Sequence, residues 1–97
     1  MKTVTGSVPT LYAAKYIEQL CKHWAHKLEV ERSGATGVVR FPTGDVTMSD
    51  SGGNLIVTIR AEDEAAVEQL MRVVATHLDR FAFREAPLAF EWSPVEG

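Results

Sequence analysis

The sequence predicts an α+β fold: a two-layer sandwich in which a mostly antiparallel sheet of five or six strands carries two antiparallel helices on one face. Three observations support this prediction. Two segments place apolar residues at helical spacing, the segments between them alternate apolar with polar residues, and the intervening turns are rich in Gly, Pro, Ser and Asp. The predicted order is β-α-β-β-β-β-α-β, with residues 1–97 forming a single domain.

The first part of the chain predicts a strand followed by a helix. Residues 3–8 form the strand, Pro9 ends it, and Thr10 is expected to cap a helix that extends to about Lys27. Apolar side chains recur along this helix every three or four residues and should face a core, namely Ala13, Ile17, Leu20, Cys21, Trp24 and Leu28. Beside them an amphipathic shoulder is expected, formed by Tyr12, Tyr16, Gln19, His23 and Lys27.

Four short strands are predicted next, in the segments KLEVER, GVVRF, DVTMS and NLIVTIR. Their inward set is apolar and consists of Leu28, Val30, Val39, Phe41, Val46, Met48, Leu55, Val57 and Ile59. Their outward set is polar and consists of Glu29, Glu31, Arg40, Thr47, Thr58 and Arg60. Since one face of the sheet is therefore exposed to water, both helices must cover the other face.

The second helix is predicted from about Asp63 to Phe81, because acidic residues at its start suit the positive end of the helix dipole. Its buried face should contain Ala66, Val67, Leu70, Val73, Val74, His77, Leu78 and Phe81. Pro87 prevents helical structure from continuing. The segment LAFEW (88–92) then predicts a last strand whose inward residues are Leu88, Phe90 and Trp92.

Composition limits the classes of partner. The net charge is −3 and the Lys and Arg residues are scattered, which argues against a nucleic-acid partner. No apolar run approaches the length of a membrane span, so no membrane partner is expected. The single cysteine excludes an intrachain disulfide and favours a reducing, cytoplasmic location. No flavin or nicotinamide signature is present, so no cofactor is expected, and the protein should be a monomer or a homodimer.

The segment CKHWAHK brings a thiol, two imidazoles and an indole together. On a helix, Cys21 and His23 point about 200° apart, so they cannot hold the same ion. His23 and His26 are neighbours on the helix surface, but two ligands are fewer than zinc sites use. We therefore expect structural or surface roles for the two histidines and no metal site, with a ligand-binding role as the alternative.

His77 stands in an apolar helix face, where a histidine is expected to be a hydrogen-bonded core residue held in one tautomer. Because His77 and His23 both lie late in helices that run in opposite directions, their separation along the axes should be about 14 Å. The sequence therefore predicts that the three histidines do not form one site within a chain.

The segment RFAFRE contains Arg80, Arg84 and Glu85, which either bind an anion or form an ion pair, and we expect the ion pair. Aromatic side chains either line a pocket or fill the core. Core packing is expected for Trp24, Phe81, Phe83, Phe90 and Trp92.

The strings QLCKHWAHK (19–27) and HLDRFAFRE (77–85), together with Trp92, resemble the bacterial family called domain of unknown function 2218 over essentially the whole chain. The resemblance implies that the family motif falls on His23, Trp24, His26, Lys27, His77, Arg80, Phe81, Phe83, Arg84 and Glu85. Similar domains occur beside, or fused to, siderophore-interacting flavin reductases, which implies a link to iron handling. The family has no established activity.

Together these observations favour a non-enzymatic binding or accessory module with an unknown small molecule or protein as its partner. Its candidate binding residues are His23, Trp24, His26, His77, Arg80 and Arg84. One alternative is a small enzyme with a histidine general base, which requires a cleft and a carboxylate or carbonyl that orients the ring. Another is a structural or oligomeric module that uses the outer sheet face or the amphipathic shoulder.

Overall fold

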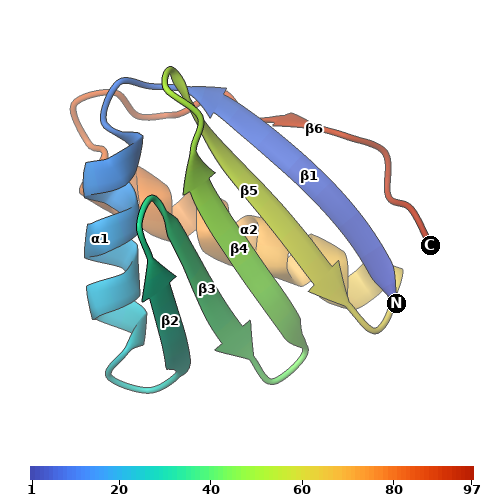
Figure 1. Ribbon diagram of the computed structural model, residues 1–97. Coiled ribbons are helices and arrows are strands. Elements are labelled where there is room, and N and C mark those ends of the chain that lie inside the picture. The colour runs from blue at the N-terminus through green and yellow to red at the C-terminus, as the bar shows by residue number, and fades with distance from the viewer.

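Six strands form one sheet in the order β2-β3-β4-β5-β1-β6 in the computed structural model, which describes residues 1–97 (Figure 1). All neighbouring strands pair antiparallel. The strands are β1 (Lys2–Pro9), β2 (Glu29–Ser33), β3 (Thr36–Phe41), β4 (Gly44–Asp50), β5 (Asn54–Ala61) and β6 (Glu91–Trp92), and the helices are α1 (Ala13–Trp24) and α2 (Glu64–Phe81). The predicted α+β class and the predicted order of elements are confirmed.

The core lies between the sheet and the two helices, and the alternation of the strands determines which side chains enter it. The inward residues of β3, β4 and β5 are almost all fully buried. The fully buried ones are Val39, Val46, Met48, Leu55, Val57 and Ile59. At the margin, Leu28, Val30 and Phe41 are half-buried and pack against this core. The opposite face of the sheet stays open to solvent, as predicted.

The outer face carries a small ion-pair network. The Arg40 guanidinium lies 3.2 Å from Glu29, 2.5 Å from Glu31 and 3.2 Å from Asp45, so that one cation joins β2, β3 and β4. The hydrogen bond to Glu31 is the largest cause that raises the pKa of Arg40. Because these side chains are exposed, the network adds little to stability and serves mainly to align the edge of the sheet.

The ends of α1 differ from the prediction. The helix begins at Ala13, and Thr10, three residues earlier, does not cap it. The Thr10 hydroxyl accepts a hydrogen bond from the Tyr12 N–H at 3.1 Å and donates one to Glu85. The helix ends at Trp24, whose carbonyl accepts the Leu28 N–H at 2.8 Å, so residues 25–27 form a turn. His26 therefore lies in this turn and not on the helix.

The second helix agrees with the prediction. The Asp63 carboxylate caps it by accepting the Ala66 N–H at 2.8 Å, and the helix continues to Phe81. Its most buried side chains are Val67, Leu70, Val74 and Leu78. Neither helix is long and apolar enough to cross a membrane.

The last strand is shorter than predicted, because only residues 91–92 of the expected range 88–92 pair with β1. Glu96 then forms an isolated bridge with Thr3 of β1. The Leu88 N–H donates to the Asp79 carboxylate at 3.2 Å, so this backbone donor is held by α2 instead of by the sheet. Trp92 does face inward: it lies opposite Gly6, and its ring stacks on Phe90 with centroids 4.8 Å apart.

Gly6 leaves the space that Trp92 occupies, because a Cβ at this position would lie 2.5 Å from the indole ring. We expect Gly6→Ala to displace Trp92 and to lower the free energy of unfolding by about 1–3 kcal/mol, as overpacking usually does. Urea unfolding monitored by tryptophan fluorescence measures this. Gly53→Ala is the matched control, since nothing lies within 4 Å of a Cβ there, and an equal loss in both variants would contradict the assigned role of Gly6.

Candidate functional site

The two helices meet along the C-terminal half of α2, and their contacts run in antiparallel order. The ring centroids of His77 and Trp24 lie 5.4 Å apart, those of Phe81 and His23 lie 5.9 Å apart, and Glu85 reaches Tyr16 further along α1. Figure 1 shows α2 running across α1 instead of alongside it, so the N-terminal half of α2 lies away from α1.

The structure overturns the predicted separation of the histidines. The rings of His23 and His77 lie 5.3 Å apart, not at opposite ends of the helix pair. The predicted separation assumed that the two helix axes lie side by side. Figure 1 instead shows α2 running across α1, so residues late in both helices can meet where the helices cross.

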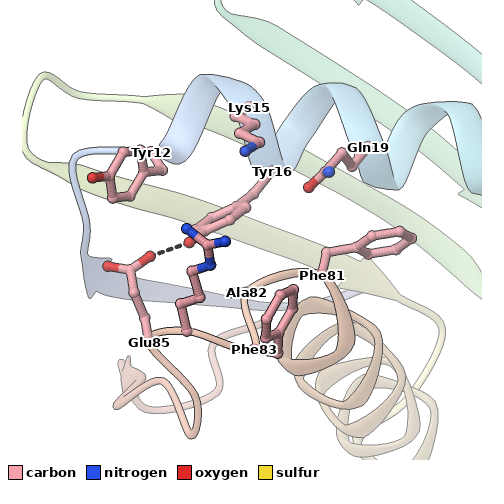
Figure 2. A pocket seen from close by; sticks show the side chains of 9 residues that line it. Tyr12, Lys15, Tyr16, Gln19, Phe81, Ala82, Phe83 and Glu85 are labelled. Atoms are coloured by element: carbon pink, nitrogen blue, oxygen red, sulfur yellow. Dashed lines mark hydrogen bonds between the residues drawn. The ribbon is translucent and has the colours of Figure 1, made fainter.

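The helix interface leaves a cavity of about 480 Å³ that we call the tyrosine pocket (Figure 2). Tyr12, just before α1, and three residues of α1 form one wall, and the end of α2 with the segment that follows forms the other. The lining residues are Tyr12, Lys15, Tyr16, Gln19, Phe81, Ala82, Phe83, Arg84 and Glu85.

At the floor of this pocket the Glu85 carboxylate accepts hydrogen bonds from two hydroxyl groups. Tyr16 donates to Oε2, and the Thr10 hydroxyl lies 3.0 Å from Oε2 and 3.2 Å from Oε1. Both donors are buried: Thr10 is 6% exposed and Tyr16 is 5% exposed. The carboxylate therefore joins the segment after α2 to Thr10, which precedes α1, and to Tyr16 in the first turn of α1.

The expected ion pair of Glu85 with an arginine is absent, so that prediction was wrong. Neither Arg80 nor Arg84 lies within 4.0 Å of an acidic oxygen, and the Arg84 guanidinium stands 5.8 Å from the centre of the Phe83 ring. The hydroxyl groups of Thr10 and Tyr16 occupy the position beside Glu85 where an arginine was expected. The side-chain partners of Glu85 within the protein are thus hydroxyl groups and not cations.

Burial, which is the largest cause, acts together with the hydrogen bond to Glu85 and the negative charge of Glu85 to raise the pKa of Tyr16 to about 12. The phenol therefore keeps its proton and remains a hydrogen-bond donor to Glu85 at neutral and moderately alkaline pH.

Several groups of the tyrosine pocket remain without a protein partner. The Gln19 Oε1 atom is buried and accepts no hydrogen bond, and neither Lys15 nor Arg84 forms an ion pair. Tyr12 is 55% exposed and Phe83 is 71% exposed, so the expectation that Phe83 fills the core is wrong. The pocket thus offers hydrogen-bond acceptors, positive charge and aromatic surface at once.

A second cavity, of about 440 Å³, is the histidine pocket, which is lined by His23, Trp24, His26, Lys27, Leu28, Phe41, Val73 and His77. The prediction that the three histidines stay apart is wrong in this respect, since all three border one cavity. No three His, Cys, Asp or Glu side chains are placed to hold a metal ion, however. The Trp24 indole, 6% exposed, packs edge-on against Phe41 and closes the pocket toward the core.

His77 is half-buried and its Nδ1 atom lies 2.7 Å from the Val73 carbonyl oxygen, as the core-histidine prediction requires. It also borders a cavity, so the two conditions for a general base, a cleft and an orienting carbonyl, are present in the structure. Catalysis itself stays a prediction.

Of the remaining predicted residues, Arg84 lines the tyrosine pocket and Arg80 lines neither pocket. Cys21 is buried on the core side, where burial raises the pKa of its thiol. The expected shoulder of α1 is divided: Tyr12, Tyr16 and Gln19 border the tyrosine pocket, whereas His23 and Lys27 border the histidine pocket.

The sequence reasoning missed the cluster of Thr10, Tyr16 and Glu85. One signal was available, because Tyr12, Tyr16 and Gln19 share one side of α1 at helical spacing. Their partner Glu85 was not foreseeable, since nothing local in the sequence says which segment packs against that side.

Comparisons with known proteins agree with this fold. Residues 5–93 match the model of the DUF2218 family, described as an uncharacterized protein conserved in bacteria. The structure is similar to the NMR structure of PA4090 from Pseudomonas aeruginosa, with 33% sequence identity, a TM-score of 0.85 and 100% of each chain covered. No curated protein matches the chain.

Removing the Tyr16 hydroxyl tests the Glu85 cluster. Tyr16→Phe should lower the free energy of unfolding by about 1.5–3 kcal/mol at neutral pH, because a hydrogen bond to a charged group is lost. Tyr12→Phe is the matched control, since the Tyr12 ring is 55% exposed. Urea unfolding of both variants beside the unchanged protein measures the difference, and similar losses in both would contradict the role of Tyr16.

The same residue should make stability depend on alkaline pH. Between pH 10 and about 12 the unfolded chain loses the Tyr16 proton while the folded chain retains it, so the free energy of unfolding falls as the pH rises. Below pH 10 this contribution is fully present. Unfolding curves recorded from pH 9 upward should fall more steeply for the unchanged protein than for Tyr16→Phe, and parallel curves would show that the Tyr16 pKa is not raised.

Proposed function

The chain belongs to the bacterial DUF2218 family, and we propose that it is a non-enzymatic binding module that holds a small aromatic acid in the tyrosine pocket. The observation that carries this proposal is the unpaired chemistry of that pocket. Two cations, a buried amide oxygen without a partner and exposed aromatic rings surround one cavity of about 480 Å³. A cavity of this size is typical of small-molecule sites.

Each unpaired group selects a feature of the ligand. Lys15 and Arg84 supply positive charge, so they favour a carboxylate on the ligand. The exposed ring of Phe83, which faces the Arg84 guanidinium, offers a surface on which a planar ring can stack.

The acceptors of the pocket require hydrogen-bond donors. Gln19 Oε1 has no partner, and an unpaired buried acceptor lowers stability until a donor reaches it. Glu85 Oε1 accepts only the longer contact from Thr10, at 3.2 Å, and so retains acceptor capacity. A ring that carries hydroxyl groups beside its carboxylate meets both requirements.

A hydroxylated aryl acid such as 2,3-dihydroxybenzoate combines these three features, and catechol groups of this kind chelate iron in siderophores. The proposal therefore extends to an accessory role in iron or siderophore handling. Its support is the ligand chemistry above and the likeness to domains found beside siderophore-interacting flavin reductases. A reducing cytoplasm is the proposed location, which suits the single buried thiol of Cys21.

The experiment is a titration of the ¹⁵N-labelled protein with 2,3-dihydroxybenzoate, followed by amide chemical shifts. We expect saturable shifts at Tyr16, Phe83 and Glu85. Arg84→Gln should weaken binding about tenfold, because one charge-assisted hydrogen bond is worth roughly 1.5 kcal/mol. Repeating the titration with the ferric complex of the same acid tests the link to iron.

Arg72→Gln is the control variant, since it removes the same charge from α2 at a position that borders neither pocket. Benzoate is the control ligand and should bind more weakly, because it has no hydroxyl donor for Gln19. Absence of saturable shifts, or equal losses in Arg84→Gln and Arg72→Gln, would refute the proposed site.

A further inference from the structure

His77 has a defined protonation pattern. Its Nδ1 atom lies 2.7 Å from the carbonyl oxygen of Val73, and a carbonyl can only accept. Nδ1 must therefore carry the proton, and in the neutral ring Nε2 keeps a free lone pair. A histidine that ligates a metal typically donates its other ring N–H to a carbonyl or a carboxylate in this way, because the bond orients the ring.

His23 supplies a second imidazole at a matching distance. The two ring centroids lie 5.3 Å apart at an angle of 50°, so the rings are tilted and not stacked. Two imidazoles bound to one tetrahedral ion, with metal–nitrogen distances of about 2.0–2.1 Å, have their ring centres about 5 Å apart. The distance between the ring centres of His23 and His77 thus matches that of a pair bound to one ion, and the exposed His23 ring can turn its nitrogen toward such an ion.

The remaining lining restricts the kind of ion. The histidine pocket contains no carboxylate, so it does not suit the hard ions Mg²⁺ and Ca²⁺. Imidazole is a preferred ligand of zinc, copper and nickel. Since no three candidate ligand side chains surround a point, only two coordination positions are supplied by the protein, and water must fill the others.

We propose that His23 and His77 bind one late first-row divalent ion, represented by Zn²⁺, in the histidine pocket. The Nε2 atom of His77 is one ligand, an imidazole nitrogen of His23 is the second, and the Val73 carbonyl holds the His77 ring in place. The apolar side chains of Trp24 and Phe41 border the ion on the core side. This site does not depend on the tyrosine pocket being occupied.

The test is a Zn²⁺ titration of the ¹⁵N-labelled protein, monitored by long-range ¹H–¹⁵N spectra of the imidazoles. Without metal, His77 should appear as the Nδ1–H tautomer. Zn²⁺ should shift its Nε2 resonance while Nδ1 stays protonated, and Mg²⁺ should shift neither. An Nε2 that remains unshifted in excess Zn²⁺ would overturn the proposal.

Variants then separate the pair from the third histidine. His77→Gln and His23→Gln should each weaken Zn²⁺ binding, measured by calorimetry, by at least about tenfold, and the double variant should not be much weaker than either. His26→Gln removes an imidazole from the same pocket outside the pair and should leave the affinity nearly unchanged. A loss in His26→Gln that equals the loss in His77→Gln would refute the assignment of the pair.

Discussion

The hydrogen bonds of the Glu85 carboxylate connect the end of α2 to the start of α1, and the arrangement of the two helices depends on them. The carboxylate accepts hydrogen bonds from Thr10, which lies before α1, and from Tyr16, which lies within it. Because no cation lies within ion-pair distance of this half-buried carboxylate, the two buried hydroxyls are its side-chain partners within the protein. The segment after α2 is thereby held against the start of α1, and the tyrosine pocket exists because that segment is held there.

Both pockets are products of the same helix contact. Phe81 lines the tyrosine pocket, and its ring also lies 5.9 Å from that of His23, which lines the histidine pocket. The crossing of the two helices that sets Glu85 beside Tyr16 also sets His77 beside His23. The two candidate sites are therefore chemically different but geometrically linked, with one aromatic side chain between them.

The fold was predictable because it follows from local periodicity: alternation placed Val46, Met48 and Val57 inward, and an acidic cap marked the start of α2. The sites were less predictable. Part of their composition was visible in the two family strings, but Tyr12, Lys15 and Tyr16 lie outside those strings. Their geometry depends on how one helix crosses the other. Thr10 shows the limit most clearly, since its residue type is right for a helix cap and its hydroxyl instead serves a carboxylate 75 residues away.

The position of β1 inside the sheet has a consequence for the order of assembly. This strand is made before both of its neighbours, β5 and β6, and it pairs with β5 along its whole length. This strand, with its inward Val4 and Val8, must therefore wait unpaired until residues 54–61 have left the ribosome. Long-range pairing of this kind slows folding and exposes strand edges to other chains, so the nascent protein is most vulnerable to aggregation before residues 54–61 emerge.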